Sequence, residues 1–129
     1  VSTVNMLLPD SKKAGILTIS KSTLSDAHLR AANVPSDTPI GTTEDGAEFS
    51  RVILNDELQL NIELARMDNI NAALKMKTDH PDLGAIILEC TNMSPYAEAI
   101  QEAVELPVFS IVNFVEWLHA GLKPKRFFS

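Results

Sequence analysis

The sequence predicts an α/β fold built on a four-stranded parallel sheet with helices on both faces. Short apolar runs alternate with helical patterns in the order βαβαβαβα, and each strand run is continuously apolar. The first pattern is typical of parallel strands joined by crossover helices, and the second is typical of strands that are buried on both faces. At 129 residues the chain has the size of one domain.

The first predicted strand and helix come from the start of the chain. Residues 14–19 form an apolar run with β-branched side chains, which favours a buried strand. Ser22 can cap a helix, so we expect a helix from residue 23 to about residue 32. Asn33 is a suitable terminator for this helix.

The middle of the chain is predicted to hold a short strand and a long helical region. The strand is expected near residues 38–42. From about residue 47 to residue 77, apolar side chains recur at helical spacings. The polar pair Asn55-Asp56 is expected to divide this helical region in two, and Pro81 is expected to stop it.

The last third of the chain is predicted to contain two strands that each lead into a helix. The expected strands are 84–90 and 106–112, and the expected helices are 94–105 and 113–120. Ser94 suits the start of the first of these helices, and Gly121 suits the end of the second.

These elements combine into one predicted domain, a flavodoxin-like three-layer sandwich over residues 12–122, with a lead-in at 1–11 and a tail at 123–129. The net charge of -6 argues against a nucleic-acid partner. The chain has neither the apolar run of roughly 18–20 residues that a membrane span needs nor a signal-peptide pattern. A single cysteine cannot form an internal disulfide. We therefore expect a cytoplasmic protein with no membrane partner.

Small polar side chains follow the predicted strands at their carboxyl ends, where open α/β sheets bind ligands. The candidate residues for ligand contact are Thr18, Ser20, Thr42, Cys90, Thr91 and Asn92. The alternative for the hydroxyl and amide side chains is a local role in helix capping and turn formation. No glycine-rich phosphate loop follows the first strand, so nucleotide binding has little support.

Cys90 is the candidate for chemistry because it stands between a buried strand and a helix start. The partial positive charge of a helix N-terminus favours a thiolate, and its unpaired N–H groups can bind a carboxylate. The alternative is a buried cysteine that serves only as a small apolar side chain. Glu89 is expected to point to the opposite side of the strand, so we do not assign it as the base.

The residues around Cys90 form a recognisable set of segments: Cys90-Thr91-Asn92-Met93-Ser94-Pro95-Tyr96, then Ala99-Ile100-Gln101 and Leu106-Pro107-Val108-Phe109. Together they resemble the second lobe of the aspartate/glutamate/hydantoin racemase superfamily. The run 14–18, the helix at 24–29 and Pro39-Ile40-Gly41 look like the first strand, first helix and second strand of the same lobe. The resemblance covers nearly the whole chain and implies one lobe of a normally two-lobed protein.

The resemblance implies a cofactor-independent racemase or related isomerase that acts on an amino acid such as aspartate or glutamate. In that family each lobe supplies one acid/base cysteine. One cysteine removes the α-proton and the other returns a proton to the opposite face. Cys90 would be one of the two, and Thr91 and Asn92 would hold the substrate carboxylate. The resemblance implies neither pyridoxal phosphate nor a metal.

The chain departs from the family because it holds one lobe and one cysteine. It begins at Val1 rather than Met, and residues 1–11 look like an interlobe segment, so we expect a fragment whose partner is the missing first lobe. The alternatives are pairing of two copies and loss of activity. Two further functions stay open: a single-cysteine lyase or decarboxylase of the same superfamily, and a non-catalytic carboxylate-binding α/β domain.

Overall fold

The structure of the protein is a computed structural model that describes residues 1–128. Its four strands are β1 (Lys13–Thr18), β2 (Ile40–Thr42), β3 (Leu83–Leu88) and β4 (Val108–Phe109). They form one sheet in the order β2-β1-β3-β4, and every neighbouring pair is parallel. The predicted α/β fold with a four-stranded parallel sheet is therefore confirmed, and its strand order is that of a flavodoxin-like sandwich.

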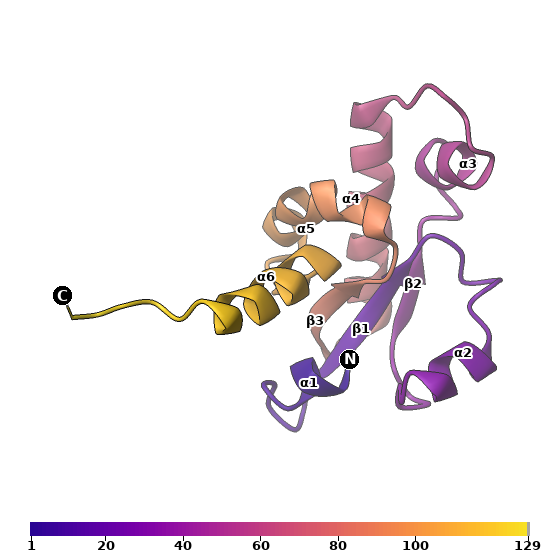
Figure 1. Cartoon of the computed structure of the whole chain (residues 1–129). Helices are drawn as coiled ribbons and strands as arrows, with labels where there is room; N and C mark the ends of the chain where they lie inside the picture. The colour runs from indigo at the N-terminus through magenta and orange to yellow at the C-terminus, as the bar shows by residue number, and fades with distance from the viewer. Residues whose placement is uncertain (129) are drawn as a thin grey trace.

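Helices cover the two faces of the sheet unequally (Figure 1). On one face, α4 contacts α3, α5, β2 and β3. These helices are α3 (Phe49–Leu54), α4 (Ile62–Asp79) and α5 (Ala97–Val104). The second face carries three elements, α1 (Ser2–Asn5), α2 (Asp26–Ala31) and α6 (Ile111–Leu122). In Figure 1, α6 and the residues after it project away from the rest of the molecule.

The buried core lies between the sheet and the helices α3, α4 and α5. Leu17 of β1 and Ile86 and Leu88 of β3 form its sheet side. Phe49 and Tyr96 pack edge to face across it, with ring centroids 5.7 Å apart, an arrangement that adds to the stability gained from burying the rings. The other members of the core are Ala65, Ala73, Met76, Leu83, Met93, Ile100 and Val104.

Glycines in β1 and β2 allow α4 to lie close to the sheet. A Cβ atom on Gly15 would lie 2.1 Å from Met76 Cε and 2.6 Å from Leu83 Cδ1. A Cβ atom on Gly41 would lie 3.0 Å from Met76 Sδ. The Met76 side chain therefore fills the space that side chains at both positions would otherwise occupy.

The predicted division of the middle of the chain is confirmed. The helix α3 ends at Leu54, and α4 begins at Ile62, so Asn55-Asp56 lies in the connection between them. The short strand β2 falls within the predicted range of residues 38–42. The helix α4 has His80 as its C-cap, directly before Pro81.

The helix after β1 begins later than the sequence predicts. Its N-cap is Ser25, whose Oγ accepts a hydrogen bond from the His28 N–H at 3.4 Å. Ser22 does not cap the helix because its N–H and its hydroxyl both donate to the carboxylate of Glu44. Asn33 follows the helix with a φ of 54°, as suits a residue that ends a helix.

The fourth strand and the last helix also differ from the prediction. Strand β4 ends at Phe109 rather than near residue 112 because Ser110 and Asn113 form a capping box that starts α6 there. The Ser110 N–H donates to Asn113 Oδ1 at 3.0 Å. The helix therefore begins before the predicted residue 113, and Gly121 lies inside it rather than after it.

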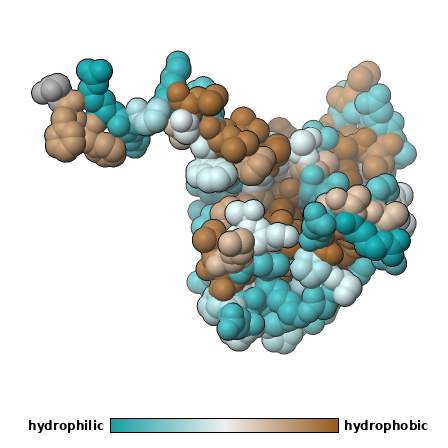
Figure 2. All heavy atoms as spheres, turned by 60° about the horizontal axis from the view of Figure 1, so that its bottom comes forward, coloured by the Kyte–Doolittle hydropathy of each residue, from teal (hydrophilic) through white to brown (hydrophobic). Residues whose placement is uncertain are grey.

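The helix α6 is the least covered element of the fold. All of its residues are exposed, and Figure 2 shows its apolar side chains on the part that projects at the upper left. One stripe, Ile111, Phe114 and Trp117, faces a cavity on the sheet. The other, Val115, Leu118 and Leu122, is between 51% and 79% exposed. No helix within residues 1–128 combines the length and apolar character that crossing a membrane requires.

Candidate functional site

Polar side chains meet at the carboxyl ends of β1 and β3, the neighbouring strands between which the strand order reverses direction. Such a switch point is where open α/β sheets bind ligands. The Thr18 hydroxyl donates to Glu89 Oε2 at 3.0 Å, and the Ser20 N–H donates to Thr18 Oγ1 at 3.3 Å. Thr18 is buried and Glu89 is exposed. The hydroxyl therefore orients a carboxylate that stays accessible to a ligand.

A second polar cluster holds the loop after β1. The carboxylate of Glu44 accepts hydrogen bonds from Ser20 Oγ at 2.8 Å, the Lys21 N–H at 2.9 Å and Thr42 Oγ1 at 3.1 Å. The hydrogen bond from Ser22, followed by that from Ser20, lowers the pKa of Glu44 from 4.5 to about 2. Glu44 is therefore ionised at neutral pH and ties this loop to the end of β2.

Cys90 lies beyond the end of β3 rather than inside the strand. It is the N-cap residue of the 3₁₀ helix η1 (Thr91–Tyr96), which continues directly into α5. The predicted helix start at Ser94 is therefore wrong. The helical segment begins at Thr91 and Pro95 lies inside η1. The tighter 3₁₀ turns tolerate the proline here because it stands at the junction with α5, where a regular α-helical hydrogen bond is not yet required.

Two buried side chains of η1 fix the position of Cys90. Met93 is 0% exposed and Tyr96 is 7% exposed, and burial raises the pKa of the Tyr96 phenol. The Met93 N–H donates to the carbonyl of Cys90 at 3.0 Å. Cys90 itself is half-buried and packs against the core. The exposed residues Thr91 and Asn92 occupy the first two positions of η1, whose N–H groups have no partner within a helix.

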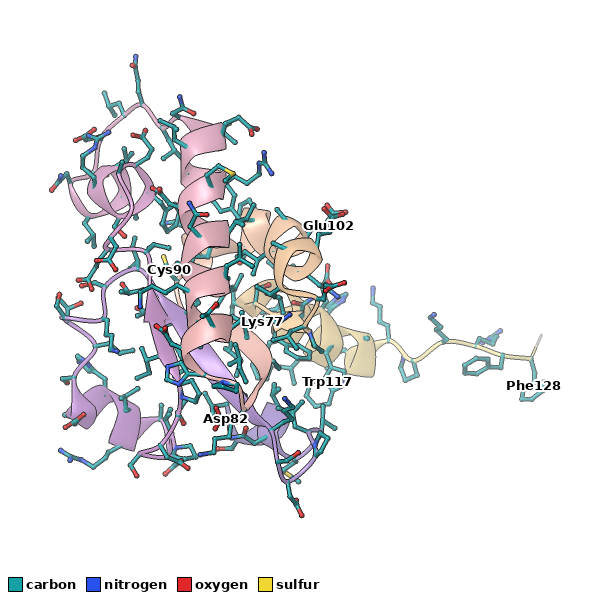
Figure 3. All side chains as sticks on the ribbon, turned by 180° about the vertical axis from the view of Figure 1, so that it is seen from behind. Lys77, Asp82, Cys90, Glu102, Trp117 and Phe128 are labelled. Atoms are coloured by element: carbon teal, nitrogen blue, oxygen red, sulfur yellow. The ribbon has the colours of Figure 1, made fainter. Side chains whose placement is uncertain are left out.

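The side chains of Cys90 and Glu89 lie on opposite faces of the sheet, as the alternation of side chains along a strand predicts. Leu88 belongs to the core, against which Cys90 packs. Ile87 and Glu89 line cavities on the second face. Figure 3 shows Cys90 beside α4, at the end of β3 opposite to Asp82.

Two cavities lie on the second face of the sheet, and both are lined by Ile87 and Glu89. The first has a volume of about 560 Å³ and extends from β1 to α2. The second has a volume of about 700 Å³ and lies between α1, the end of β3 and α6. Figure 2 shows apolar atoms in the hollow of the molecule. Cys90 lines neither cavity.

The structure brings some of the predicted site residues together and separates others. Thr18 and Ser20 line the first cavity, beside Glu89. Thr42 lies close to them, but its hydroxyl donates to Glu44. Cys90 and the two residues after it form a separate group at the start of η1. The predicted residues therefore form two groups at the carboxyl end of the sheet rather than one.

Three polar residues of this region were not among the predicted site residues. Glu44 and Glu89 organise the two hydrogen-bonded clusters, and Ser110 lines the second cavity. The sequence did contain a signal for Glu89. Side chains two positions apart on a strand point to the same face, so Glu89, at the strand end, lies on the face of Ile87. Glu44 gave no such signal, since its partners come from a loop whose path the sequence does not reveal. Within residues 1–128, no group of three or more His, Cys, Asp and Glu side chains is arranged to hold a metal ion.

Comparison with known proteins finds two partial similarities, and no family model matches the chain. Dimethylsulfoniopropionate lyase 5 of Emiliania huxleyi (strain CCMP1516) is 38% identical over 41 residues, which is 32% of this chain and 8% of that protein. Dimethylsulfoniopropionate lyase of Durusdinium sp. clade D is 30% identical over 62 residues, which is 48% of this chain and 21% of that protein. The similarity therefore spans less than a quarter of either relative.

Proposed function

We propose that the chain is one lobe of a cofactor-independent enzyme that transfers a proton at the carbon next to a substrate carboxylate, with Cys90 as the acid/base group. The observation that carries this proposal is the position of Cys90, which is half-buried at the carboxyl end of β3 and directly precedes η1. An acid/base side chain must lie within hydrogen-bond reach of the carbon acid, and ligands of open α/β sheets bind at this end.

The substrate carboxylate would bind at Thr91 and Asn92. Both are exposed, and both contribute backbone N–H groups at the first positions of η1 together with polar side chains. Such donors also stabilise the negative charge that develops on the carboxylate side of a carbanion-like transition state. Thr42 and Ser20 are less suited to this role because their hydroxyls already donate to Glu44.

Elimination is the first choice of reaction, because both relatives are named dimethylsulfoniopropionate lyases. In such an elimination the Cys90 thiolate takes the proton next to the carboxylate, and the electron pair of that C–H bond forms a C=C bond. The C–S bond breaks, and its electron pair leaves with the sulfur as a neutral thioether. One acid/base group suffices for this reaction, and Cys90 is the candidate for that group.

Racemisation of an amino acid is the second candidate, favoured by the likeness of Cys90-Thr91-Asn92 and the segments around it to the racemase superfamily. It requires another acid/base group on the opposite face of the substrate. That group would come from a first lobe or from a second copy of the chain. The exposed apolar stripe on α6 formed by Val115, Leu118 and Leu122 supports such a partner.

The test is turnover by the chain and by its Cys90→Ser variant in D₂O. Dimethylsulfoniopropionate is the substrate for elimination, followed by gas chromatography of dimethyl sulfide. Both enantiomers of aspartate and glutamate are the substrates for α-proton exchange, followed by NMR. We expect the variant to lose about 10²- to 10⁴-fold of whichever activity is present. Equal activity of the two proteins would contradict the role of Cys90.

Alkylation tests the site without turnover, because Cys90 is the single thiol of the chain. Iodoacetate carries a carboxylate and iodoacetamide does not, so a carboxylate site beside the thiol should favour iodoacetate. We expect propionate to protect Cys90 from iodoacetate, as measured by mass spectrometry over time. Slow modification by both reagents, without protection, would identify Cys90 as a packing residue.

A further inference from the structure

We propose that the second cavity, between α1, the end of β3 and α6, is a binding site for a small onium cation, a quaternary ammonium or sulfonium group. The inference goes beyond the proposed function, because Cys90 does not line this cavity and its chemistry is not needed for binding there. The volume of about 700 Å³ lies within the range of small-molecule sites, about 300–1,000 Å³.

The walls of the cavity are aromatic on one side. Phe109 of β4 and Phe114 and Trp117 of α6 all line it. The rings of Phe114 and Trp117 are tilted by 38° with centroids 6.5 Å apart, so they form one continuous aromatic surface. Aromatic faces carry negative potential and attract cations, and they are the usual means by which proteins bind methylated onium groups.

The charged side chain of the cavity is a carboxylate. Glu89 is the one charged side chain that lines it, and no lysine or arginine side chain lines either of the two cavities on this face. Val1, which carries the α-amino group of the chain, also lines both cavities. The Thr18 hydroxyl orients the Glu89 carboxylate through their 3.0 Å hydrogen bond. A cation would gain attraction from both the carboxylate and the rings, and the α-amino group of Val1 would offset part of the attraction to the carboxylate.

The scarcity of polar groups selects the kind of cation. Besides Glu89, the side-chain polar groups of the lining residues are the hydroxyls of Thr3 and Ser110 and the indole N–H of Trp117. A primary ammonium or a metal ion would lose more hydrogen bonds or oxygen ligands than these groups replace. An onium group has no N–H to satisfy, and its methyl groups suit the apolar lining formed by Val4, Leu7 and Ile111.

The test uses the fluorescence of Trp117, which is the single tryptophan of the chain and lines the cavity. Tetramethylammonium chloride is titrated against sodium chloride of equal concentration, and tert-butanol serves as a neutral molecule of similar shape. We expect a saturable change in emission with tetramethylammonium, with a dissociation constant on the order of millimolar, and no saturable change with the two controls. An equal response to tert-butanol would overturn the proposal, because it would show a merely apolar cavity.

Single variants test whether the Glu89 carboxylate and the Phe114 ring contribute to tetramethylammonium binding. Glu89→Gln should weaken tetramethylammonium binding by about three- to ten-fold. Glu102→Gln, on the exposed side of α5 (Figure 3), should leave it unchanged. Phe114→Leu, which keeps Glu89, should also weaken tetramethylammonium binding. NMR line broadening of the tetramethylammonium methyl signal measures the binding. Unchanged affinity in both Glu89→Gln and Phe114→Leu would refute the site.

Two further outcomes are informative. Cys90→Ser should keep full tetramethylammonium affinity, so failure of the proposed catalytic role would not affect this result. If the emission of Trp117 changes with protein concentration but not with tetramethylammonium, the cavity is closed by a second copy of the chain and the onium site is refuted. Circular dichroism of each variant establishes that it is folded.

Discussion

The hydroxyl of Thr18 donates to Glu89 Oε2 at 3.0 Å and so joins the carboxyl ends of the two central strands. The next residue after Glu89, Cys90, packs against the core on the other face of the sheet. Two consecutive residues at one strand end therefore supply a carboxylate to one face and a thiol to the other. The hydrogen bond between Thr18 and Glu89 therefore holds in place the end of β3, which contributes to both faces of the sheet.

Replacing Thr18 by valine tests this link. The variant keeps the shape of the side chain but loses the hydrogen bond to Glu89 and the one accepted from the Ser20 N–H. We expect the free energy of unfolding to fall by about 1–2 kcal/mol, because the Ser20 N–H loses its partner in a buried setting. Urea denaturation measures the change. Thr18→Ser keeps the hydroxyl and should lose less, and a larger loss in Thr18→Ser than in Thr18→Val would contradict the argument.

Glu44→Gln tests the hydrogen-bonded cluster after β1. Glutamine cannot accept as many hydrogen bonds from Ser20, Ser22 and Thr42 as the carboxylate does, because its NH₂ group replaces one accepting oxygen with a donor. We expect the variant to be less stable than the natural chain by about 1–2 kcal/mol at pH 7. Thermal unfolding followed by circular dichroism measures the difference.

The pH dependence of that difference follows from the pKa of Glu44, which folding lowers from 4.5 to about 2. A group whose pKa is lower in the folded state contributes stability above its unfolded pKa and loses it as the pH falls toward its folded pKa. The advantage of the natural chain over Glu44→Gln should therefore be constant above about pH 5 and shrink between pH 4.5 and 2. A difference that stays constant down to pH 2 would show that Glu44 does not stabilise the fold through its charge.

Gly15→Val tests the close approach of α4 to the sheet. A side chain at this position would meet Met76 Cε, Leu83 Cδ1 and, at 3.2 Å, the carbonyl oxygen of Pro39. Met76 can move but the backbone carbonyl cannot, so we expect a loss of about 1–3 kcal/mol in the free energy of unfolding. Gly121→Ala is the control, since nothing lies within 4 Å of its added Cβ. That variant should gain about 0.5–1 kcal/mol from helix propensity.

The sequence predicted the strand and helix order and the parallel sheet because these depend on long apolar runs and helical spacing. It failed where a single side chain decides a boundary. Ser110 ended β4 early through its capping box with Asn113, and Ser22 was unavailable as a cap because Glu44, far along the chain, accepts its hydrogen bonds. Contacts between distant residues of this kind leave no periodic pattern.

The candidate site was predictable in part for the same reason. Strand ends can be located from apolar runs, so Thr18, Ser20 and Cys90 were found near the carboxyl end of the sheet. The face on which each side chain lies follows from alternation along a strand, and the opposite placement of Glu89 and Cys90 was predicted in this way. The cavities themselves depend on how α1, α2 and α6 cover the second face, and no local pattern specifies that arrangement.

Replacing the exposed stripe of α6 tests whether it binds a second copy or another lobe. Val115 is 55% exposed and Leu118 is 51% exposed, and neither lines the cavity beside Trp117. We expect the natural chain to associate as its concentration rises, and the double variant Val115→Lys/Leu118→Glu to stay monomeric, because charged side chains are costly in an apolar contact. Light scattering coupled to size exclusion measures the mass. Equal masses for the two proteins at every concentration would show that the stripe does not mediate self-association.

The lengths of the outer strands bear on how copies of this protein can meet. The sheet ends in β2, with three residues, on one side and in β4, with two, on the other. Edge strands this short offer few free backbone groups, and natural proteins use short edge strands to prevent sheets from joining edge to edge. Copies of the chain are therefore poorly suited to pairing through their edge strands into continuous sheets or fibrils. Its apolar helix can remain uncovered without exposing a template for amyloid-like stacking.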